Sequence, residues 1–445
     1  MQDVSYDVSA ALSALMYDIS GQSGLVNLTL DEILTAQVDL RDSGATCYEH
    51  LDELLTIVEA NHLGDVVVLD CSWSYGDTYG TMNATTFSFP DGESYVAYRG
   101  TGAGNWEYNA ESAYGYGSSD MQDWALEYFN NTIENNNLAD SDIYVAGHSQ
   151  GGNNAMYVTL YSEYGENIVE CVSIDGPGFN ETVAAEAQSL DNFDAQLNKI
   201  YGVYGENDYV HVLGEVQLTD PDHTLTVATP TADDVASYHD IFSHFSEDGV
   251  LCEEAETGAV TTYAEYIVKY VNALDKDDRY QFALTVMGLI EGFIGDKTWD
   301  LDVNSFSDFM QVVTGIGAVL AATAEYVIIA IHDAVVSAIN SIQAFIHSLS
   351  AGVKYAANNP YFKVDTAKLE SYATRIIMVN ARLNDLDDDM RSLYWQVGFS
   401  DLWDILTANL IVGGSPTLNK IKNYLNDAAD DFALAEQKAN QYMSG

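Results

Sequence analysis

Residues 143–152, IYVAGHSQGG, constrain the fold of this chain more than any other part of its sequence. An apolar run leads into Gly-x-Ser-x-Gly and a helical pattern follows, the order found where a parallel strand turns sharply into a helix. Gly147 and Gly151 flank Ser149, because side chains at these positions would collide with the strand and the helix in so tight a turn. The pattern predicts a serine hydroxyl lifted above the sheet, with the Gln150 amide beside it as a donor to an oxyanion.

Residues 1–255 alternate short apolar runs with helical segments. The apolar runs are 65–73, 94–101, 142–149, 167–176 and 199–205, and the clearest helical segments are 121–136 and 152–165. Strand, helix and strand in repetition predict an α/β domain with a mostly parallel central sheet. The ligand site of such a sheet lies beyond the carboxyl ends of its strands, which is where the serine turn falls.

Strand signals stop after about residue 255. Residues 259–293 and 305–358 have helical patterns, and an Asn-Asn-Pro breaker at 358–360 precedes the last unit. We therefore expect the α/β domain to be followed by an all-α region that ends in a helical hairpin. The expected parts are an α/β catalytic domain over 1–255, a helical region over 256–358 and a C-terminal helical hairpin over 359–445.

The last unit carries two apolar seams of heptad spacing. One seam runs from Leu369 to Val397 in alternating steps of three and four residues, and the other runs from Leu418 to Ala435. A Gly-Gly-Ser-Pro turn at 413–416 separates them. Two such helices predict an antiparallel hairpin whose excess apolar surface is covered by another helix of the chain or by a partner.

The charge of the chain restricts its partners. It has 16 Lys and Arg residues against 68 Asp and Glu residues, and its net charge is −52 at pH 7. Nucleic acids and anionic lipid surfaces attract basic patches, so we expect neither nucleic-acid binding nor a polybasic membrane anchor. The four cysteines form no Cys-x-x-Cys and no Cys-His cluster, which argues against a zinc site and a dense disulfide framework.

We expect no segment that crosses a membrane or directs Sec export. Residues 1–21 carry acidic side chains where a secretory signal has basic ones. The most apolar stretch, 312–331, is interrupted by Glu325 and lacks basic flanks. This pattern favours a buried or partner-facing helix, so the protein is not expected to be an integral membrane protein.

A serine nucleophile needs a base and an orienting acid, which in this architecture follow it in the order acid, then histidine. Asp208 comes just after the apolar run 199–205, at the carboxyl end of a predicted strand. Asp175 follows the preceding run, in the sequence Asp-Gly-Pro-Gly. It lies one strand earlier than the usual acid position, and its setting favours a turn. We predict Asp208 as the acid and keep Asp175 as its alternative.

Four histidines follow the serine within the α/β region, and two of them are candidates for the base. His211 is three residues from the predicted acid and is expected to point elsewhere, and His223 lies in a polar loop, TDPDHT. His239 comes where a last strand would give way to the final helix, and His244 lies about one helical turn further on. We predict His239 as the base, with His244 as the alternative. His148, next to the serine, is expected to pack beside the turn.

A second oxyanion donor is expected from a loop after an earlier strand. The run 95–101 ends in Arg-Gly-Thr, so the backbone can approach closely at the glycine and the Thr101 amide can face Ser149. A plain strand-to-loop turn is the alternative. Residues 102–119 are rich in Gly and Tyr and include Trp106, which suits a lid, an acyl-chain wall or a simple surface loop.

These strings together resemble a known family. VAYRGT, AGHSQGG, Gly-x-x-Asp at 205–208, DGPGF at 175–179 and a late histidine are similar to the class 3 lipase group of the α/β-hydrolases, in its bacterial branch. The resemblance covers about residues 1–255 and implies an enzyme that cleaves carboxylic esters of lipids without a metal or an organic cofactor. One departure is Tyr98, where such lipases often have phenylalanine. The resemblance assigns Ser149 as nucleophile, Asp208 as acid, His239 as base, and Thr101 and Gln150 as oxyanion donors.

Residues 360–445 resemble the helical targeting modules of type VII secretion substrates, the LXG-like and WXG-motif families. Two departures are that the chain reads Trp395-Gln-Val-Gly398 and that no Tyr-x-x-x-Asp/Glu follows at Tyr424. This resemblance implies export without a Sec signal together with small helical-hairpin partner proteins, and without it we expect a cytoplasmic protein. The alternative to an enzyme is a non-catalytic secretion or interaction protein on a hydrolase scaffold.

Overall fold

The computed structural model describes residues 6–20, 22–72, 82–102, 106–230 and 236–294, and the structural statements below concern these residues. They belong to the first of two compact units, Met1–Ala318. The predicted helical segment 305–358, the apolar stretch within it and the predicted hairpin over 359–445 lie outside the described residues. Within the described ranges, no helix has both the length and the apolar content that a membrane span requires.

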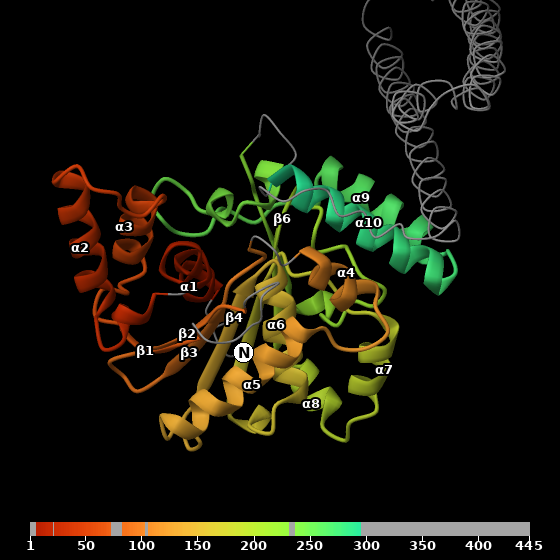
Figure 1. Cartoon of the computed structure of the whole chain (residues 1–445), viewed down its shortest axis with the longest axis horizontal. Coiled ribbons are helices and arrows are strands. Elements are labelled where there is room, and N and C mark those ends of the chain that lie inside the picture. The colour runs from red at the N-terminus through yellow and green to blue at the C-terminus, as the bar shows by residue number, and fades with distance from the viewer. Residues whose placement is uncertain (1–5, 21, 73–81, 103–105, 231–235, 295–445) are drawn as a thin grey trace, which may run out of the picture. The chain divides into compact units, whose positions relative to one another are not determined.

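A seven-stranded sheet forms the centre of this unit (Figure 1). Its strands lie side by side in chain order: β1 (Val67–Cys71), β2 (Ala84–Ser88), β3 (Ser94–Tyr98), β4 (Ile143–His148), β5 (Ile168–Ile174), β6 (Ile200–Gly205) and β7 (Thr224–Val227). The first three strands pair antiparallel, whereas β3 to β7 are parallel to their neighbours. The predicted α/β domain with a mostly parallel sheet is therefore confirmed, and the parallel strands end at one common edge.

Two strands, β2 and β7, fall outside the predicted apolar runs. Both contain two threonines, in ATTFS and TLTV, so neither forms an apolar run although threonine has a high β propensity. The hydroxyl of Thr86 on β2 is buried and lies 2.8 Å from that of Tyr128. A hydrogen-bonded threonine can therefore occupy the sheet interior where the sequence pattern calls for an apolar residue.

Helices cover both faces of the sheet (Figure 1). On one face α1 (Tyr6–Ile19) packs against β3, β4 and β5, and α2 (Leu30–Asp42) and α3 (Leu51–Ala60) lie beside it. On the other face lie α5 (Asp120–Asn135) and α6 (Gln150–Tyr161). Strands between two helical layers are buried on both sides, which explains why the parallel ones read as continuous apolar runs.

Shorter elements complete the unit. The remaining α-helices are α4 (Trp106–Tyr114), α7 (Glu181–Gln188), α8 (Phe193–Leu197), α9 (Ala259–Asn272) and α10 (Lys276–Ile294). The 3₁₀ helices are η1 (Ser23–Leu25), η2 (Gly165–Asn167), η3 (Pro221–His223), η4 (Ala236–His239) and η5 (Ile241–His244). All four cysteines, Cys47, Cys71, Cys171 and Cys252, are free.

Helices α9 and α10 follow the predicted boundary near residue 255 and pack against the α/β domain. α10 lies along α4, and its Arg279, which is only 6% exposed, pairs with the buried carboxylate of Glu215. On α9 the Thr261 hydroxyl donates to the main-chain carbonyls of Glu206 and Asp208. α9 therefore supports the turn that carries the predicted acid.

Candidate active site

The turn between β4 and α6 holds Ser149 in a strained backbone conformation. Its φ of 58° and ψ of −127° lie where residues other than glycine are rarely found. The Ser149 amide donates to the Ile174 carbonyl of the neighbouring strand β5 at 2.8 Å. A Cβ at Gly147 would come within 2.2 Å of the Gly151 carbonyl oxygen, and one at Gly151 within 2.2 Å of the Tyr98 carbonyl oxygen. The close approach of strand and helix therefore requires both glycines.

Ser149, His239 and Asp208 come together at the carboxyl edge of the sheet. His239 Nε2 lies 2.8 Å from Ser149 Oγ, and His239 Nδ1 lies 2.6 Å from Asp208 Oδ1. The serine precedes α6, the aspartate follows β6, and the histidine is the last residue of η4. One imidazole thus connects a hydroxyl to a carboxylate at hydrogen-bond distances on both sides.

Asp208 is fully buried, and its carboxylate accepts four hydrogen bonds. Oδ1 accepts from His239, and Oδ2 accepts from the Val210 amide at 3.0 Å, the His211 amide at 2.8 Å and the His211 ring at 2.7 Å. Burial by itself raises the pKa of Asp208, but attraction to His239 and the hydrogen bonds from the two histidines outweigh it and hold the pKa well below its ordinary value. The carboxylate therefore stays ionised at neutral pH.

The side chain of His239 is largely buried, with 16% of its surface exposed. Burial lowers its pKa, but the charge and hydrogen bond of Asp208, followed by the charge of Asp175, raise the pKa above the ordinary value of 6.5. With the Nδ1 proton donated to Asp208, Nε2 is the atom that can accept a proton from Ser149. The environment therefore strengthens the imidazole as a base.

The alternative acid and the alternative base pair with each other. Asp175 Oδ2 lies 2.8 Å from His244 Nε2, and both side chains are fully buried. Asp175 Oδ1 accepts from the Gly205 amide at 2.9 Å, and His244 Nδ1 lies 3.3 Å from a backbone carbonyl. Both nitrogens of His244 thus lie near groups other than Ser149, and the structure brings His239 rather than His244 to Ser149.

His148 packs beside the serine turn, between the two other histidines. Its ring centroid lies 4.7 Å from that of His239 and 6.4 Å from that of His244, and its Nδ1 lies 2.5 Å from the Tyr17 hydroxyl. Burial, followed by the charges of His239 and His244, lowers the pKa of His148 well below its ordinary value. His148 is therefore neutral when either neighbouring histidine carries a proton.

Gly100 and Thr101 lie against the serine turn, where a second oxyanion donor is expected. A Cβ at Gly100 would lie 3.0 Å from the His148 carbonyl oxygen and 3.2 Å from Ser149 Cβ. The Thr101 hydroxyl accepts from Asn109 of α4 at 2.8 Å. The glycine therefore allows the close approach, and the bond to α4 fixes the next residue of the loop.

Gln150 is the first residue of α6, so its amide cannot reach a carbonyl one helical turn earlier. Its side chain is buried and donates to Ser112 Oγ at 3.1 Å and to Asn154 Oδ1 at 3.3 Å. These bonds anchor the side chain within the helical layer. The main-chain amide remains at the helix N-terminus, beside Ser149, where negative charge is favoured.

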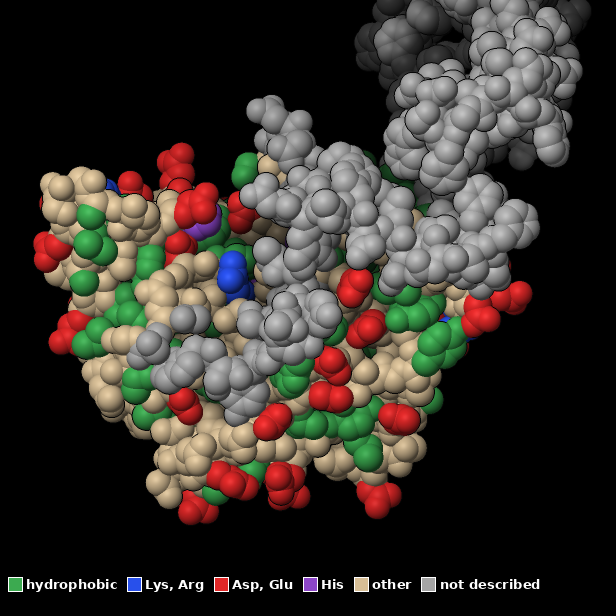
Figure 2. Space-filling model, viewed as in Figure 1, with side chains coloured by type: hydrophobic (Ala, Val, Ile, Leu, Met, Phe, Trp, Pro, Cys, Tyr) green, Lys and Arg blue, Asp and Glu red, His purple; other side chains and the backbone are tan. Residues whose placement is uncertain are grey.

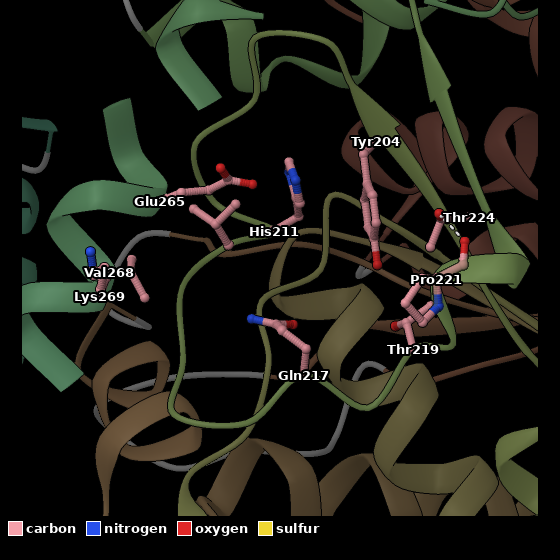
Figure 3. Close-up of a pocket in the computed structure, with 10 residues that line it drawn as sticks. Tyr204, His211, Gln217, Thr219, Pro221, Thr224, Glu265, Val268 and Lys269 are labelled. Atoms are coloured by element: carbon pink, nitrogen blue, oxygen red, sulfur yellow. Dashed lines mark hydrogen bonds between the residues drawn. The ribbon is translucent and has the colours of Figure 1, made fainter. Parts of the chain in front are cut away.

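His211 does not point away from the predicted acid, so that expectation is wrong. Its ring bonds to Asp208 and stacks on Tyr204, with centroids 4.2 Å apart and planes at 9°. It also lines a groove of about 490 Å³, whose other wall includes Glu265 and Lys269 of α9 (Figure 3). A histidine three residues after an aspartate in a turn can reach back to it, and this spacing was the available signal.

Two sets of three side chains bring atoms that could ligate a metal within 4.8 Å of one another. The sets are His148, Asp175 and His239, and Asp175, Asp208 and His211. Most of these atoms take part in the aspartate–histidine pairs described above, which explains why they lie close together.

Asp and Glu side chains are spread over the face of the molecule seen in Figure 2, and Lys and Arg side chains are few on it. This distribution agrees with the net charge of −52. The summed field of such a surface disfavours anionic ligands and favours neutral or cationic ones.

Residues 76–286 match the family model described as Mbeg1-like. The match includes Ser149, Asp208 and His239 and extends past residue 255 into α10. A search among curated proteins finds no match. The described part of the matched residues belongs to the α/β domain with a mostly parallel sheet, and the class 3 lipase assignment stays a prediction.

Proposed function

We propose that this chain is a serine hydrolase that cleaves carboxylic esters, with lipid esters as its substrates. The observation that carries the proposal is the continuous connection from Ser149 through His239 to Asp208, at 2.8 and 2.6 Å. The positive φ of the serine and its place between a parallel strand and a helix N-terminus add to it. A structural serine needs neither the strained turn nor a histidine held by a buried carboxylate.

In the acylation step Ser149 Oγ attacks the ester carbonyl carbon while His239 Nε2 takes the hydroxyl proton. The ionised Asp208 stabilises the imidazolium that forms. The amides of Gln150 and Thr101 are the proposed donors to the tetrahedral oxyanion, and one such donor is typically worth about 3 kcal/mol. The intermediate then collapses, the carbon–oxygen ester bond breaks, and His239 returns the proton to the leaving alcohol.

In the deacylation step a water attacks the acyl carbon of the Ser149 ester. His239 takes the proton of the water and gives it to Ser149 Oγ as the acyl–oxygen bond breaks, which releases the carboxylic acid. The same imidazole therefore acts as base and acid in both steps, and this chemistry needs no metal and no organic cofactor.

Lipid esters are proposed as the substrate class from the resemblance and from the character of the site. Segment 102–119 follows the proposed oxyanion strand and contributes α4, where Tyr108 and Tyr114 are buried, while Tyr116 is 54% exposed. Aromatic side chains in the segment that follows the proposed oxyanion strand suit an acyl chain. The acidic surface favours neutral esters over anionic ones.

An active-site phosphonate provides the first test. We expect it to label Ser149 in the wild type and to label no serine in Ser149→Ala. Ser173→Ala is the matched control, because Ser173 is a fully buried serine at the same end of the neighbouring strand β5 and should not take the label. Labelling of Ser149→Ala at the wild-type rate would overturn the assignment of the nucleophile.

A chain-length series of fatty-acyl esters, with phospholipid vesicles, tests the substrate class. We expect hydrolysis by the wild type to increase when the substrate forms micelles or vesicles, and Ser149→Ala to be inactive on all of them. Activity confined to soluble short-chain esters would leave a plain esterase. A wild type that hydrolyses no ester and takes no label would favour the non-catalytic interaction protein.

Export of the enzyme by type VII secretion, with small helical-hairpin partners bound to residues 300–445, is a further proposal. It follows from the sequence resemblance of 360–445 alone, since these residues lie outside the described part of the chain. Copurification from the native cell tests it. Normal export after deletion of 360–445, without a bound helical partner, would refute the targeting role.

A further inference from the structure

Asp175 is a buried charged residue that the proposed mechanism does not use. It follows β5 in a left-handed backbone conformation, with a φ of 47°, and its side chain is fully buried. Its amide donates to the Val203 carbonyl of β6 at 2.9 Å. A fully buried carboxylate is costly unless its oxygens are paired, so its partners show what holds it there.

One carboxylate oxygen of Asp175 holds the turn that carries the acid. Oδ1 accepts from the Gly205 amide at 2.9 Å, and the Gly205 carbonyl in turn accepts from the Asp208 amide at 3.0 Å. Gly205 is the last residue of β6, where the chain leaves the sheet. The carboxylate therefore fixes the point from which the Asp208 turn departs.

The other oxygen forms a close ion-pair contact with the segment that carries the proposed base. Oδ2 lies 2.8 Å from Nε2 of His244, which ends η5, and His239 ends the preceding 3₁₀ helix. The His244 carbonyl also accepts from the Cys252 amide at 2.8 Å, so the segment is held from both sides. The two 3₁₀ helices are short, and short 3₁₀ turns need such tertiary contacts to keep their geometry.

Asp175 is also next in sequence to the residue that supports the nucleophile. The carbonyl of Ile174 accepts from the Ser149 amide at 2.8 Å, and His148 Nε2 lies 3.8 Å from Asp175 Oδ2. The end of β5 thus contacts the nucleophile turn, the acid turn and the base segment at once.

We propose that Asp175 is a positioning residue that ties the turns of Asp208 and His239 to the strand end beside Ser149. This inference rests on the proposed function, because it concerns the same three residues. In this role the Asp175–His244 pair keeps Ser149, His239 and Asp208 at their distances and does not touch the substrate.

Two variants of Asp175 distinguish the effect of its hydrogen-bonding contacts from the effect of its charge. Asp175→Ala removes both oxygens, and we expect kcat for ester hydrolysis to fall about 10²-fold with KM nearly unchanged, because misplaced catalytic groups affect the chemical step. Asp175→Asn keeps an acceptor for the Gly205 amide and offers a donor to neutral His244, and asparagine tolerates the left-handed conformation. We therefore expect Asp175→Asn to recover most of the wild-type kcat.

The pH profile is a readout that a merely structural role would not change. Asp175→Asn removes a negative charge near His239, so the acid limb of kcat/KM should move to lower pH. The titratable groups around this carboxylate are His148, His211, His239, His244, Asp208, Tyr204 and Tyr17. Glu170→Gln is the matched control, since Glu170 is a buried acidic residue earlier on the same strand, and it should leave the limb in place.

The outcomes separate this inference from the proposed function. A folded Asp175→Ala with wild-type kcat would overturn the positioning role while ester hydrolysis by the wild type stands. If Asp175→Ala does not fold, as judged by circular dichroism, His244→Ala decides: a lowered kcat with KM nearly unchanged supports the role, and a wild-type kcat overturns it. A wild type that neither hydrolyses esters nor takes a phosphonate at Ser149 would overturn both proposals.

Discussion

Two aspartate–histidine pairs lie at the same edge of the sheet, and only one of them reaches Ser149, the proposed nucleophile. The distances are similar, 2.6 Å for Asp208–His239 and 2.8 Å for Asp175–His244. In both pairs the carboxylate raises the pKa of the histidine against the effect of burial. The pairing of the two residue types therefore does not by itself identify a reactive site.

The two pairs differ in what lies beyond the histidine. His239 directs its second nitrogen at Ser149 and has 16% of its side chain exposed, whereas His244 is fully buried and its second nitrogen faces a backbone carbonyl. A proton can leave His239 toward a substrate, but His244 has no such path among the described contacts. The comparison teaches that a third partner and access to solvent separate a catalytic pair from a positioning pair.

Exchange of each histidine for alanine should give the largest contrast between the pairs. We expect His239→Ala to lower kcat on the order of 10⁵-fold, as much as Ser149→Ala, because members of such a triad act as a unit. His244→Ala should lose only about 10²-fold, since it displaces the base instead of removing it. Steady-state hydrolysis of one soluble ester measures both. Should His244→Ala be inactive while His239→Ala keeps most activity, the roles of the two histidines must be exchanged.

Asp208→Asn should have the next largest effect. The asparagine keeps the size of the acid but loses the charge that stabilises the imidazolium and can impose the wrong tautomer on His239, so kcat should fall about 10⁴-fold. Asp175→Asn is the matched control in the other pair and should retain most of the activity. Equal losses in the two variants would contradict the division into a catalytic pair and a positioning pair.

The acid limb of the pH profile should move in opposite directions when either member of the Asp175–His244 pair loses its charge. Only neutral His239 can accept the serine proton, and its pKa is raised, so kcat/KM should fall as the pH drops through a value above 6.5. The charge of His244 lowers the pKa of His239, whereas that of Asp175 raises it. We therefore expect His244→Gln to move the limb to higher pH and Asp175→Asn to move it to lower pH. Shifts in the same direction would show that the second pair does not act through its charges.

The serine turn could be predicted from sequence because its determinants are local. The strand, the two glycines and the helix start all lie within 143–152. The structure requires Gly147 for the close approach of β4 and α6, and Gly151 for the close approach of α6 to the end of β3. Asp208 was also predictable, since it directly follows the apolar run that forms β6. The α/β architecture followed from the same apolar runs, because parallel strands buried on both faces are continuous in sequence.

The second pair could not be predicted in this way. Asp175 and His244 are far apart in the sequence, and their pairing depends on how β5, β6 and η5 meet in space. His239 and His244 end successive 3₁₀ turns of similar composition, so no local pattern says which one faces the serine. The threonine-rich strands β2 and β7 escaped a search for apolar runs. On β2 a hydrogen-bonded hydroxyl replaces a buried apolar side chain, and β7 is an edge strand whose first residue is exposed.

The smallest expected change in kcat comes from replacing His211, the second histidine that bonds to Asp208. His211→Phe removes the ring bond of 2.7 Å to the carboxylate but keeps a flat ring for stacking on Tyr204. The carboxylate retains His239 and the two main-chain amides, so we expect a loss of about 1 kcal/mol, or about fivefold in kcat. Tyr204→Phe is the control in the same groove, since it keeps the stacking and does not touch Asp208. If His211→Phe were as inactive as Asp208→Asn, proton transfer would run through His211, and the contrast between its role and that of His239 would not hold.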